Sequence, residues 1–352
     1  MPLPIETFSG THYEMGVQHG RAFRHAVYAT VANTLRHDFE ESDAELDAGL
    51  SEVRASNLAF APWLEEELRG IAEGSGVDYA LIERLHLRVW NNVPRARRAA
   101  PACTSMGMRT ADAGVIVGGN LDDPRTAYAL VRRLPQNGLA HVMITWIGAA
   151  WGHNGMNAAG LAVAQSSLGG YAPEPDRGGE NYLRGSLGTR LLLEHCRDVP
   201  AALALLRKIR LESSYVLGDA AGNLVACQCL GGFEPMVQDA DAHGGMVFST
   251  NHIHMPELLE RLAQAGCQPD IAEHSAVRFA AVARARDQLP RTLAAFQAIL
   301  RSHDGYPHSV CRDATAFSTF SLPQRMPTVF NLADRPPCRN AFYEYPIRTA
   351  VE

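Results

Sequence analysis

The chain has 352 residues, of which 46% are hydrophobic and 20% are charged, a balance typical of a globular protein rather than a disordered one. Its formal net charge of −6 argues against a general nucleic-acid binder. No apolar run reaches the roughly 18 residues of a membrane helix, and the N-terminus lacks the basic and apolar pattern of a secretion signal. We therefore expect a cytoplasmic protein without a membrane partner.

The first hundred residues are predicted to be helical. Thr11 and Glu14 have the spacing of a capping box that starts a helix, and Gly16 and Gly20, four residues apart, would allow another element to approach closely. Further helices are expected near residues 44–57, from Pro62 to a stop at Gly74, and after a cap at Asp78. Residues 95–102 form an arginine- and alanine-rich linker without periodicity.

Beyond this linker the pattern becomes that of strands. Strands are expected at 103–108, 115–121, 129–134, 141–147, 161–166, 214–219, 224–230, 246–251, near Val310, and at 315–322, 328–332 and 342–345. Helices are expected at 182–197 and 200–209, with two or three more between residues 256 and 302; residues 152–157 are expected to be a turn and 169–181 a loop. Alternating runs of strands and helices, with hairpins between neighbouring strands, indicate antiparallel sheets with helices outside.

The seven cysteines are odd in number, irregularly spaced and without a C-x-x-C pair, which fits a reducing compartment rather than a disulfide framework or a zinc site. His252 and His254 have no third metal ligand in pattern, so no metal is expected. Lys208 is the only lysine, and its context fits neither a phosphate-binding loop nor a pyridoxal phosphate Schiff base. We expect no cofactor.

Cys103 is the sharpest candidate for chemistry, because it begins the first strand directly after the linker. If the chain were cut before it, Cys103 would own both a thiol and a free α-amine. An α-amine has a pKa of about 8, so it could act as the base for its own side chain. The alternative is a buried strand cysteine.

The sequence resembles the acyl-coenzyme A:6-aminopenicillanic acid acyltransferase (isopenicillin N acyltransferase) family of N-terminal-nucleophile (Ntn) hydrolases. It contains a series of motifs in the order and spacing of that family. These motifs lie at residues 8–10, 13–20, 102–105, 118–122, 152–162, 219–222, 250–252, 307–312 and 337–345. The resemblance implies an α+β fold, a four-layer αββα sandwich preceded by a helical N-terminal segment. It also implies self-cleavage between Ala102 and Cys103. The resulting fragments, 1–102 and 103–352, would stay together as one globular αβ heterodimer, and further homo-oligomerisation is left open.

The resemblance also assigns roles to individual residues. Cys103 would be the nucleophile and α-amine base, Asp122 would orient the amine, and Asn251 would donate to the oxyanion. Arg312 would hold Asp122 ionised or bind a substrate carboxylate, with a structural ion pair as the alternative. Asn120, Asn154 and His252 are candidate substrate-binding residues.

The implied function is that of a self-processing cysteine amidohydrolase or acyltransferase. It would act on an amide or thioester of a small molecule through a thioester acyl-enzyme. Acyl-coenzyme A is left open as a substrate and is not expected as a cofactor. One alternative is a hydrolase of small β-alanyl or acyl amines; another is a non-cleaving relative that serves as a binding or scaffold protein. Ala102 bears on the latter, because the family commonly has glycine before the cut. Leu121 and Asp123 stand where penicillin-forming members have aromatic residues, so an aromatic acyl pocket is not expected.

Overall fold

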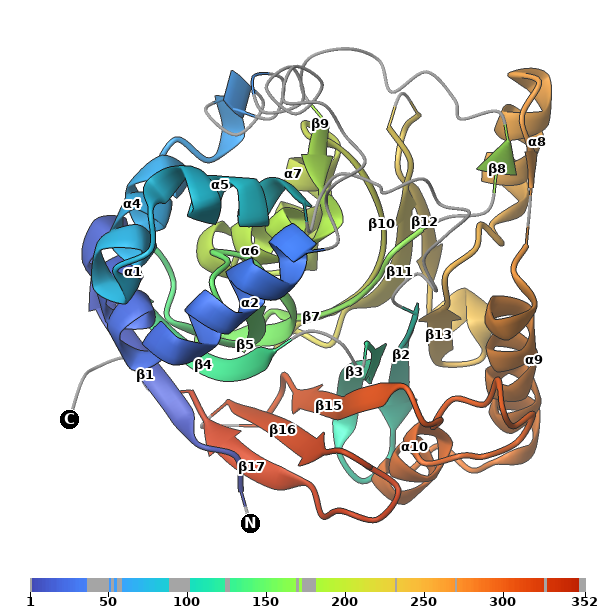
Figure 1. Ribbon diagram of the computed structural model, residues 1–352. Helices are drawn as coiled ribbons and strands as arrows, with labels where there is room; N and C mark the ends of the chain where they lie inside the picture. Colours follow the sequence, from blue (N-terminus) through green and yellow to red (C-terminus); the bar gives the residue numbers. More distant parts are fainter. Residues whose placement is uncertain are drawn as a thin grey trace.

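The protein, seen here in a computed structural model, is built from two β-sheets that face each other and carry helices on their outer sides (Figure 1). The structure describes residues 2–36, 51, 54–55, 59–88, 102–123, 127–168, 171–172, 182–231, 233–269, 271–325 and 328–347. Most of the predicted helix at 44–57, the linker before Ala102 and most of the predicted loop at 169–181 lie outside these residues.

The larger sheet has nine strands. Its order is β1 (Ile5–Gly10), β4 (Tyr128–Pro135), β5 (His141–Trp146), β6 (Gly152–Asn157), β7 (Ala162–Ser166), β10 (Arg210–Gly218), β11 (Leu224–Cys229) and β12 (Met236–Asp239), with β9 (Tyr182–Arg184) paired to β10. Its pairs are antiparallel except β1 with β4 and β9 with β10, which are parallel.

The smaller sheet has six antiparallel strands. Its order is β13 (Met246–Ser249), β2 (Ala102–Thr110), β3 (Gly114–Asp122), β15 (Thr315–Leu322), β16 (Val329–Asp334) and β17 (Tyr343–Pro346). The predicted hairpin after the linker is confirmed as β2 and β3, in a register that pairs Ala102 with Asp122 and Thr110 with Gly114. A separate two-stranded ribbon joins β8 (Tyr171–Ala172) to β14 (Gln268–Pro269).

Helices complete the outer layers. On the side of the larger sheet lie α1 (His12–Ala22), α2 (Arg24–Arg36), α4 (Leu64–Ser75), α5 (Tyr79–Arg88), α6 (Gly185–His195) and α7 (Val199–Leu206). On the side of the smaller sheet lie α8 (Pro256–Gln264), α9 (Glu273–Gln288) and α10 (Leu293–Leu300), and the short helix η1 (Asp241–His243) precedes β13.

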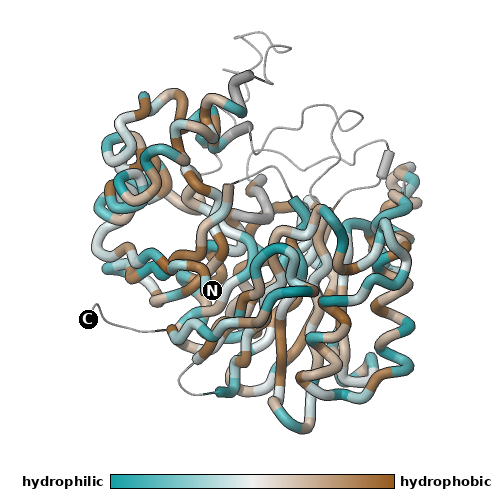
Figure 2. Tube along the Cα trace, turned by 60° about the horizontal axis from the view of Figure 1, so that its bottom comes forward, coloured by the Kyte–Doolittle hydropathy of each residue, from teal (hydrophilic) through white to brown (hydrophobic). Residues whose placement is uncertain are grey.

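The apolar residues divide into three layers that match this order. One core joins α1, α4 and α6 to the larger sheet, a second lies between the two sheets, and a third joins the smaller sheet to α9 and α10. Figure 2 shows hydrophobic stretches running through the central strands, whereas the outer helices alternate between hydrophilic and hydrophobic residues. The predicted four-layer αββα sandwich is confirmed.

The N-terminal segment follows the local signals of its sequence. Thr11 and Glu14 form the predicted capping box at the start of α1, and the Asp78 side chain accepts from the Ala80 amide at the start of α5 at 2.8 Å. A Cβ at Gly16 would lie 2.2 Å from the Glu67 carbonyl oxygen, so α1 and α4 can pack at this distance only because the position is glycine.

Several expectations about individual elements are wrong. The N-terminal segment is not wholly helical, because Ile5–Gly10 forms β1 along the edge of the larger sheet. Helix α4 ends at Ser75 and not at Gly74, and Gly76, with a positive φ of 74°, is its C-cap. Residues 152–157 form strand β6 instead of a turn, 182–184 form strand β9 instead of the start of a helix, and Val310 lies outside the strands.

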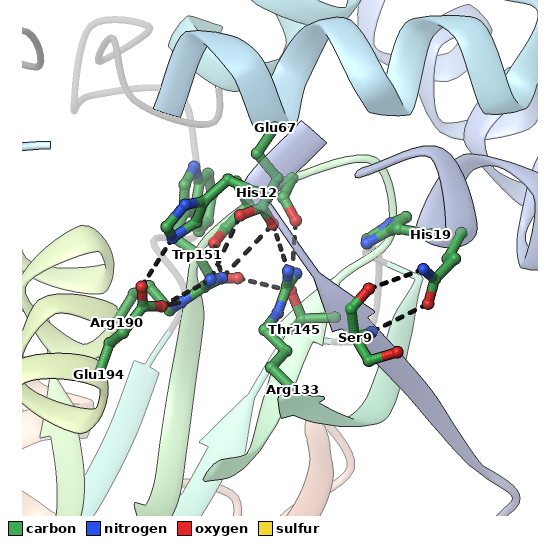
Figure 3. Close-up of polar contacts among 12 residues, drawn as sticks. Ser9, His12, His19, Glu67, Arg133, Thr145, Trp151, Arg190 and Glu194 are labelled. Carbon is green, nitrogen blue, oxygen red and sulfur yellow. Dashed lines mark hydrogen bonds and ion pairs between the residues drawn. The ribbon is translucent and has the colours of Figure 1, made fainter. Parts of the chain in front are cut away.

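A buried network of charged side chains joins the N-terminal segment to the rest of the chain (Figure 3). Glu67 of α4 pairs with Arg133 of β4 and accepts from Arg190 of α6 at 3.2 Å. Arg190 pairs with Glu194 at 2.8 Å, and Glu194 also contacts His12 of α1 at 2.7 Å. Because each charge has a partner of opposite sign, residues on both sides of the linker depend on one another.

Candidate active site

Cys103 is the second residue of β2 and its side chain is 2% exposed. Its register partner in β3 is Leu121, and both belong to the apolar core between the sheets. The main-chain nitrogen of Cys103 donates to Oδ1 of Asn251 at 2.9 Å. A side-chain acceptor therefore holds the nitrogen that self-cleavage would turn into an α-amine.

Arg278 of α9 joins the two ends of this arrangement. Its guanidinium, which is fully buried, donates to the Cys103 carbonyl oxygen, to Thr104 Oγ1 at 3.1 Å and to Asn251 Oδ1 at 2.7 Å. Its Nε donates to the main-chain oxygen of His274 at 3.0 Å. Burial lowers the pKa of Arg278 to about 10, so the group stays charged at neutral pH and fixes the position of the first residues of β2.

Asn251 uses the two ends of its amide differently. Oδ1 accepts from Cys103 and Arg278, while Nδ2 donates to the main-chain oxygen of Ser167 at 2.9 Å and to its hydroxyl at 3.1 Å. The main-chain nitrogen of Asn251 donates to Ser275 Oγ at 2.8 Å. The side chain that the sequence singles out as an oxyanion donor thus contacts Cys103 through its oxygen in this structure.

Asp122 ends β3 directly opposite Ala102. Its carboxylate accepts from Arg312 Nε at 2.9 Å and from Thr315 Oγ1 at 2.7 Å. Burial raises the pKa of Asp122, whereas the positive charges of Arg278 and Arg312 and the two hydrogen bonds lower it. The structure thus pairs the buried Asp122 with the partly buried Arg312 beside the predicted cleavage site.

His153 of β6 lies against the Cys103 thiol. Its Nε2 is 3.2 Å from Cys103 Sγ, and its Nδ1 is 2.8 Å from Asn154 Oδ1. Asn154 Oδ1 also accepts from the Gln165 amide at 3.0 Å, and its Nδ2 donates to Thr319 Oγ1 at 2.8 Å. A histidine from the larger sheet therefore reaches a cysteine of the smaller one.

Two kinds of environment act on the thiol in opposite directions. Burial raises the pKa of Cys103 to about 12, and the negative charge of Asp122 contributes to the rise. The charge of Arg278 and the main-chain amides of Ser167 and Asp122 lower this pKa. In this structure the Cys103 thiol is therefore protonated at neutral pH.

Comparison with known proteins adds the family. The sequence profile of acyl-coenzyme A:6-aminopenicillanic acid acyl-transferase matches residues 110–321, more than half of the chain. The chain belongs to this family. The match begins after Cys103 and includes Asp122, Asn251 and Arg312. Membership of this family supports an amide hydrolase or acyltransferase activity.

Solved structures were also compared. The protein is similar to a variant of the conjugated bile acid hydrolase from Clostridium perfringens, with 14% identity, 71% of this chain and 98% of that chain covered, and a TM-score of 0.47. An N-acylethanolamine-hydrolyzing acid amidase ortholog from Caenorhabditis elegans is 16% identical, with 69% of this chain and 100% of that chain covered and a TM-score of 0.44. Penicillin V acylase from Agrobacterium tumefaciens is 13% identical, with 70% of this chain and 86% of that chain covered and a TM-score of 0.44. The search of curated proteins found no match.

Two predicted substrate-binding residues of this acyltransferase-family protein have their polar atoms engaged elsewhere. Asn120 donates to the main-chain oxygens of Leu300 and Val310, both at 2.8 Å, and accepts from Ser318 Oγ, so it connects the smaller sheet to the end of α10. His252 contacts Ser275 Oγ through Nδ1 at 2.8 Å. Asn154, the third candidate, lies beside His153 as described above.

In the part of the chain that the structure describes, one group of three side chains has ligand atoms within 4.8 Å of one another: His303, Cys311 and Cys338. Sequence spacing did not indicate this group, since its members lie far apart along the chain. Among the same described residues, no helix is both long and apolar enough to cross a membrane.

Sequence reasoning missed His153 and Arg278. Gly152 and Asn154 beside His153 favour a turn, so the motif was expected to lie outside a strand. Arg278 is one of three arginines in α9, and its burial depends on the placement of this helix against β2. A full helical-face analysis of residues 273–288 could have shown Arg278 on the same side as Ala281 and Val282, which are buried.

Proposed function

We propose that this protein is a self-processing amidohydrolase or acyltransferase that uses Cys103 as its N-terminal nucleophile. The observation that carries the proposal is the hydrogen bond that the Cys103 main-chain nitrogen donates to Asn251 Oδ1 at 2.9 Å. A strand nitrogen held by a side chain keeps its position when the bond to Ala102 is cut. The new α-amine is then formed beside its own thiol, ready to act as the base.

In the processed enzyme the thiol attacks the carbonyl carbon of an amide or thioester. The proton leaves Sγ for the α-amine and a tetrahedral intermediate forms. The protonated amine then protonates the leaving group as the carbon–nitrogen bond of an amide, or the carbon–sulfur bond of a thioester, breaks. The product is a thioester on Cys103. Water completes hydrolysis, or an acceptor amine completes acyl transfer.

Asn251 has two tasks in this proposal. Oδ1 holds the α-amine, as the intact chain already holds the amide nitrogen. Nδ2 donates to the oxyanion of the tetrahedral intermediate after the Ser167 hydroxyl, 3.1 Å away, gives up its bond. The bond from Nδ2 to the Ser167 main-chain oxygen keeps the amide oriented during the exchange.

Asp122 and Arg312 fix the start of the catalytic strand. The carboxylate is neutralised by Arg312 and held by Thr315, and its negative charge lies close enough to affect the thiol. After cleavage the carboxylate orients the α-amine of Cys103 by accepting a hydrogen bond from it. Arg278, which sequence reasoning did not include, holds the Cys103 carbonyl and Asn251 in register.

The proposed substrate class is a small molecule with an amide or thioester bond, and the acceptor decides between hydrolysis and transfer. Proposed partners are this substrate and the cleaved fragment 1–102. No cofactor takes part in the proposed steps, in which acyl-coenzyme A would be an acyl donor.

The experiment is a trapping assay on the purified protein. A panel of amide and thioester substrates is offered to the wild type, Cys103→Ala and the control Cys227→Ala, whose cysteine is buried in β11. We expect wild type and Cys227→Ala to turn over substrate and to carry an acyl adduct on the peptide that begins at Cys103. Turnover by folded Cys103→Ala at the wild-type rate would contradict the assignment.

A further inference from the structure

The uncut chain lacks the base that the processed enzyme is proposed to use. Before cleavage the Cys103 nitrogen belongs to a peptide bond, so its lone pair is delocalised and cannot accept a proton. The Cys103 thiol nevertheless has to lose its proton to attack the Ala102 carbonyl carbon. This question rests on the proposed self-cleavage, and the geometry around Sγ offers an answer.

The group in contact with the thiol is an imidazole. His153 Nε2 lies 3.2 Å from Cys103 Sγ, within hydrogen-bond reach for sulfur, and both side chains are buried. The Asp122 carboxylate is already engaged by Arg312 and Thr315. Arg278, the cation that lowers the pKa of Cys103, has only donors to offer.

The tautomer of His153 follows from its neighbours. The Gln165 main-chain amide can only donate, so the Asn154 atom that it contacts at 3.0 Å must be the amide oxygen. His153 Nδ1 lies 2.8 Å from that same oxygen and must therefore carry a hydrogen. In the neutral ring Nε2 is then the acceptor, and it faces the thiol.

The supporting residues hold the ring in this state. Asn154 is fixed at its other end by Nδ2, which donates to Thr319 Oγ1 of β15 at 2.8 Å. Burial lowers the pKa of His153 to about 4, which keeps the imidazole neutral at pH 7. A neutral, oriented imidazole against a protonated thiol is the arrangement that cysteine nucleophiles use with an external base.

We propose that His153 is the general base and then the general acid of self-cleavage, a task that ends when the α-amine appears. The thiol proton moves from Sγ to Nε2 while the Sγ–carbon bond to the Ala102 carbonyl forms. Nε2 returns the proton to the Cys103 nitrogen as the peptide carbon–nitrogen bond breaks. Water then hydrolyses the Ala102 thioester, which releases the Ala102 carboxylate and regenerates the thiol.

The test follows self-cleavage of the full chain by intact mass. His153→Gln removes the basic nitrogen at similar size, and His141→Gln makes the same change at a buried histidine of the adjacent strand β5, where Nδ1 contacts the Leu139 oxygen at 2.8 Å. Cys103→Ala is the uncleaved reference. Thermal unfolding establishes that each variant is folded. If His153→Gln does not fold, His153→Asn is used in its place.

The expected result is cleavage of wild type and His141→Gln, with the His153 variant slowed by at least about 100-fold, the lower end of general acid–base contributions. Imidazole added to His153→Ala should restore cleavage, and the weaker base pyrazole should not. A folded His153 variant that cleaves within about threefold of wild type would overturn the proposal and leave the proposed function intact. A folded wild type that stays in one piece would instead contradict the proposed function, and this inference with it.

Discussion

At the scale of single residues, a substitution of Asn251 tests whether this side chain acts in the reaction or only in the fold. Its Nδ2 is proposed to bind charge that develops only in the transition state, so Asn251→Ala should lower kcat by about 10²–10³-fold and leave KM little changed. The measurement is steady-state kinetics of the processed enzyme together with its melting temperature. A lower melting temperature with an unchanged kcat would identify Asn251 as a turn residue.

Arg278 offers a second test at this scale. Lysine keeps the charge but cannot contact the Cys103 oxygen, Thr104 and Asn251 together, because it lacks the planar guanidinium. We expect Arg278→Lys to slow self-cleavage. Arg278→Met should lower the free energy of unfolding by about 1–3 kcal/mol, since it leaves the buried oxygens of Cys103 and Asn251 without this donor. Chemical denaturation and intact mass are measured on both. Wild-type stability and cleavage in Arg278→Met would show that the contacts contribute nothing.

The site shows how far sequence reasoning reaches at this scale. The motifs singled out Cys103, Asp122, Asn251 and Arg312, and the structure brings these four residues together. His153 and Arg278 escaped because their importance depends on contacts made across sheets and layers. A pattern along the chain carries no signal for such contacts.

At the scale of elements, sequence signals predicted a helix or strand correctly where its position depends on neighbouring residues in the chain alone. The capping box of α1 and the strand at residues 315–322 have the expected positions. Strand β6 was missed because its glycines suggested a turn. These glycines serve a close approach instead: a Cβ at Gly152 would lie 2.4 Å from the Ile144 oxygen, and one at Gly155 2.6 Å from the Val142 oxygen.

The contact between α1 and α4 gives a prediction for a pair of glycines. In a Cys103→Ala background, which keeps the chain in one piece, Gly16→Ala should cost about 1–3 kcal/mol or more because it forces the helices apart. The control is Gly76→Ala, where a Cβ meets nothing within 4 Å and only the positive φ is unfavourable, at about 1–2 kcal/mol. Urea unfolding measures both, and a smaller loss for Gly16→Ala than for Gly76→Ala would refute the account of the packing.

At the scale of the whole molecule, the buried charge network is expected to keep the two fragments together. Glu67 faces Arg133 and Arg190, so Glu67→Gln leaves two buried cations poorly compensated, at a cost of about 3–5 kcal/mol. Size-exclusion chromatography should show the wild-type fragments and those of the control Glu66→Gln, at an exposed position, eluting together. Fragments of Glu67→Gln should separate or precipitate, and co-elution at wild-type stability would contradict this role.

The same network predicts a response to acid. Burial alone would raise the pKa of Glu194, but Arg190 and His12 hold it well below its ordinary value. The stability that this group contributes is present above the unfolded pKa of about 4.3 and is lost as the pH falls below it. We expect the melting temperature to fall on acidification, and less steeply for Glu194→Gln. Equal slopes for both proteins would exclude this contribution.

Self-cleavage before Cys103 underlies the whole proposed mechanism, and intact mass spectrometry of the purified wild type detects it. We expect two species of about 11 and 27 kDa, in proportion to 102 and 250 residues of a 38.3-kDa chain, with Cys103 as the first residue of the larger one. Cys103→Ala should remain at the full mass. A folded wild type that shows only the full-length mass after prolonged incubation would contradict the account.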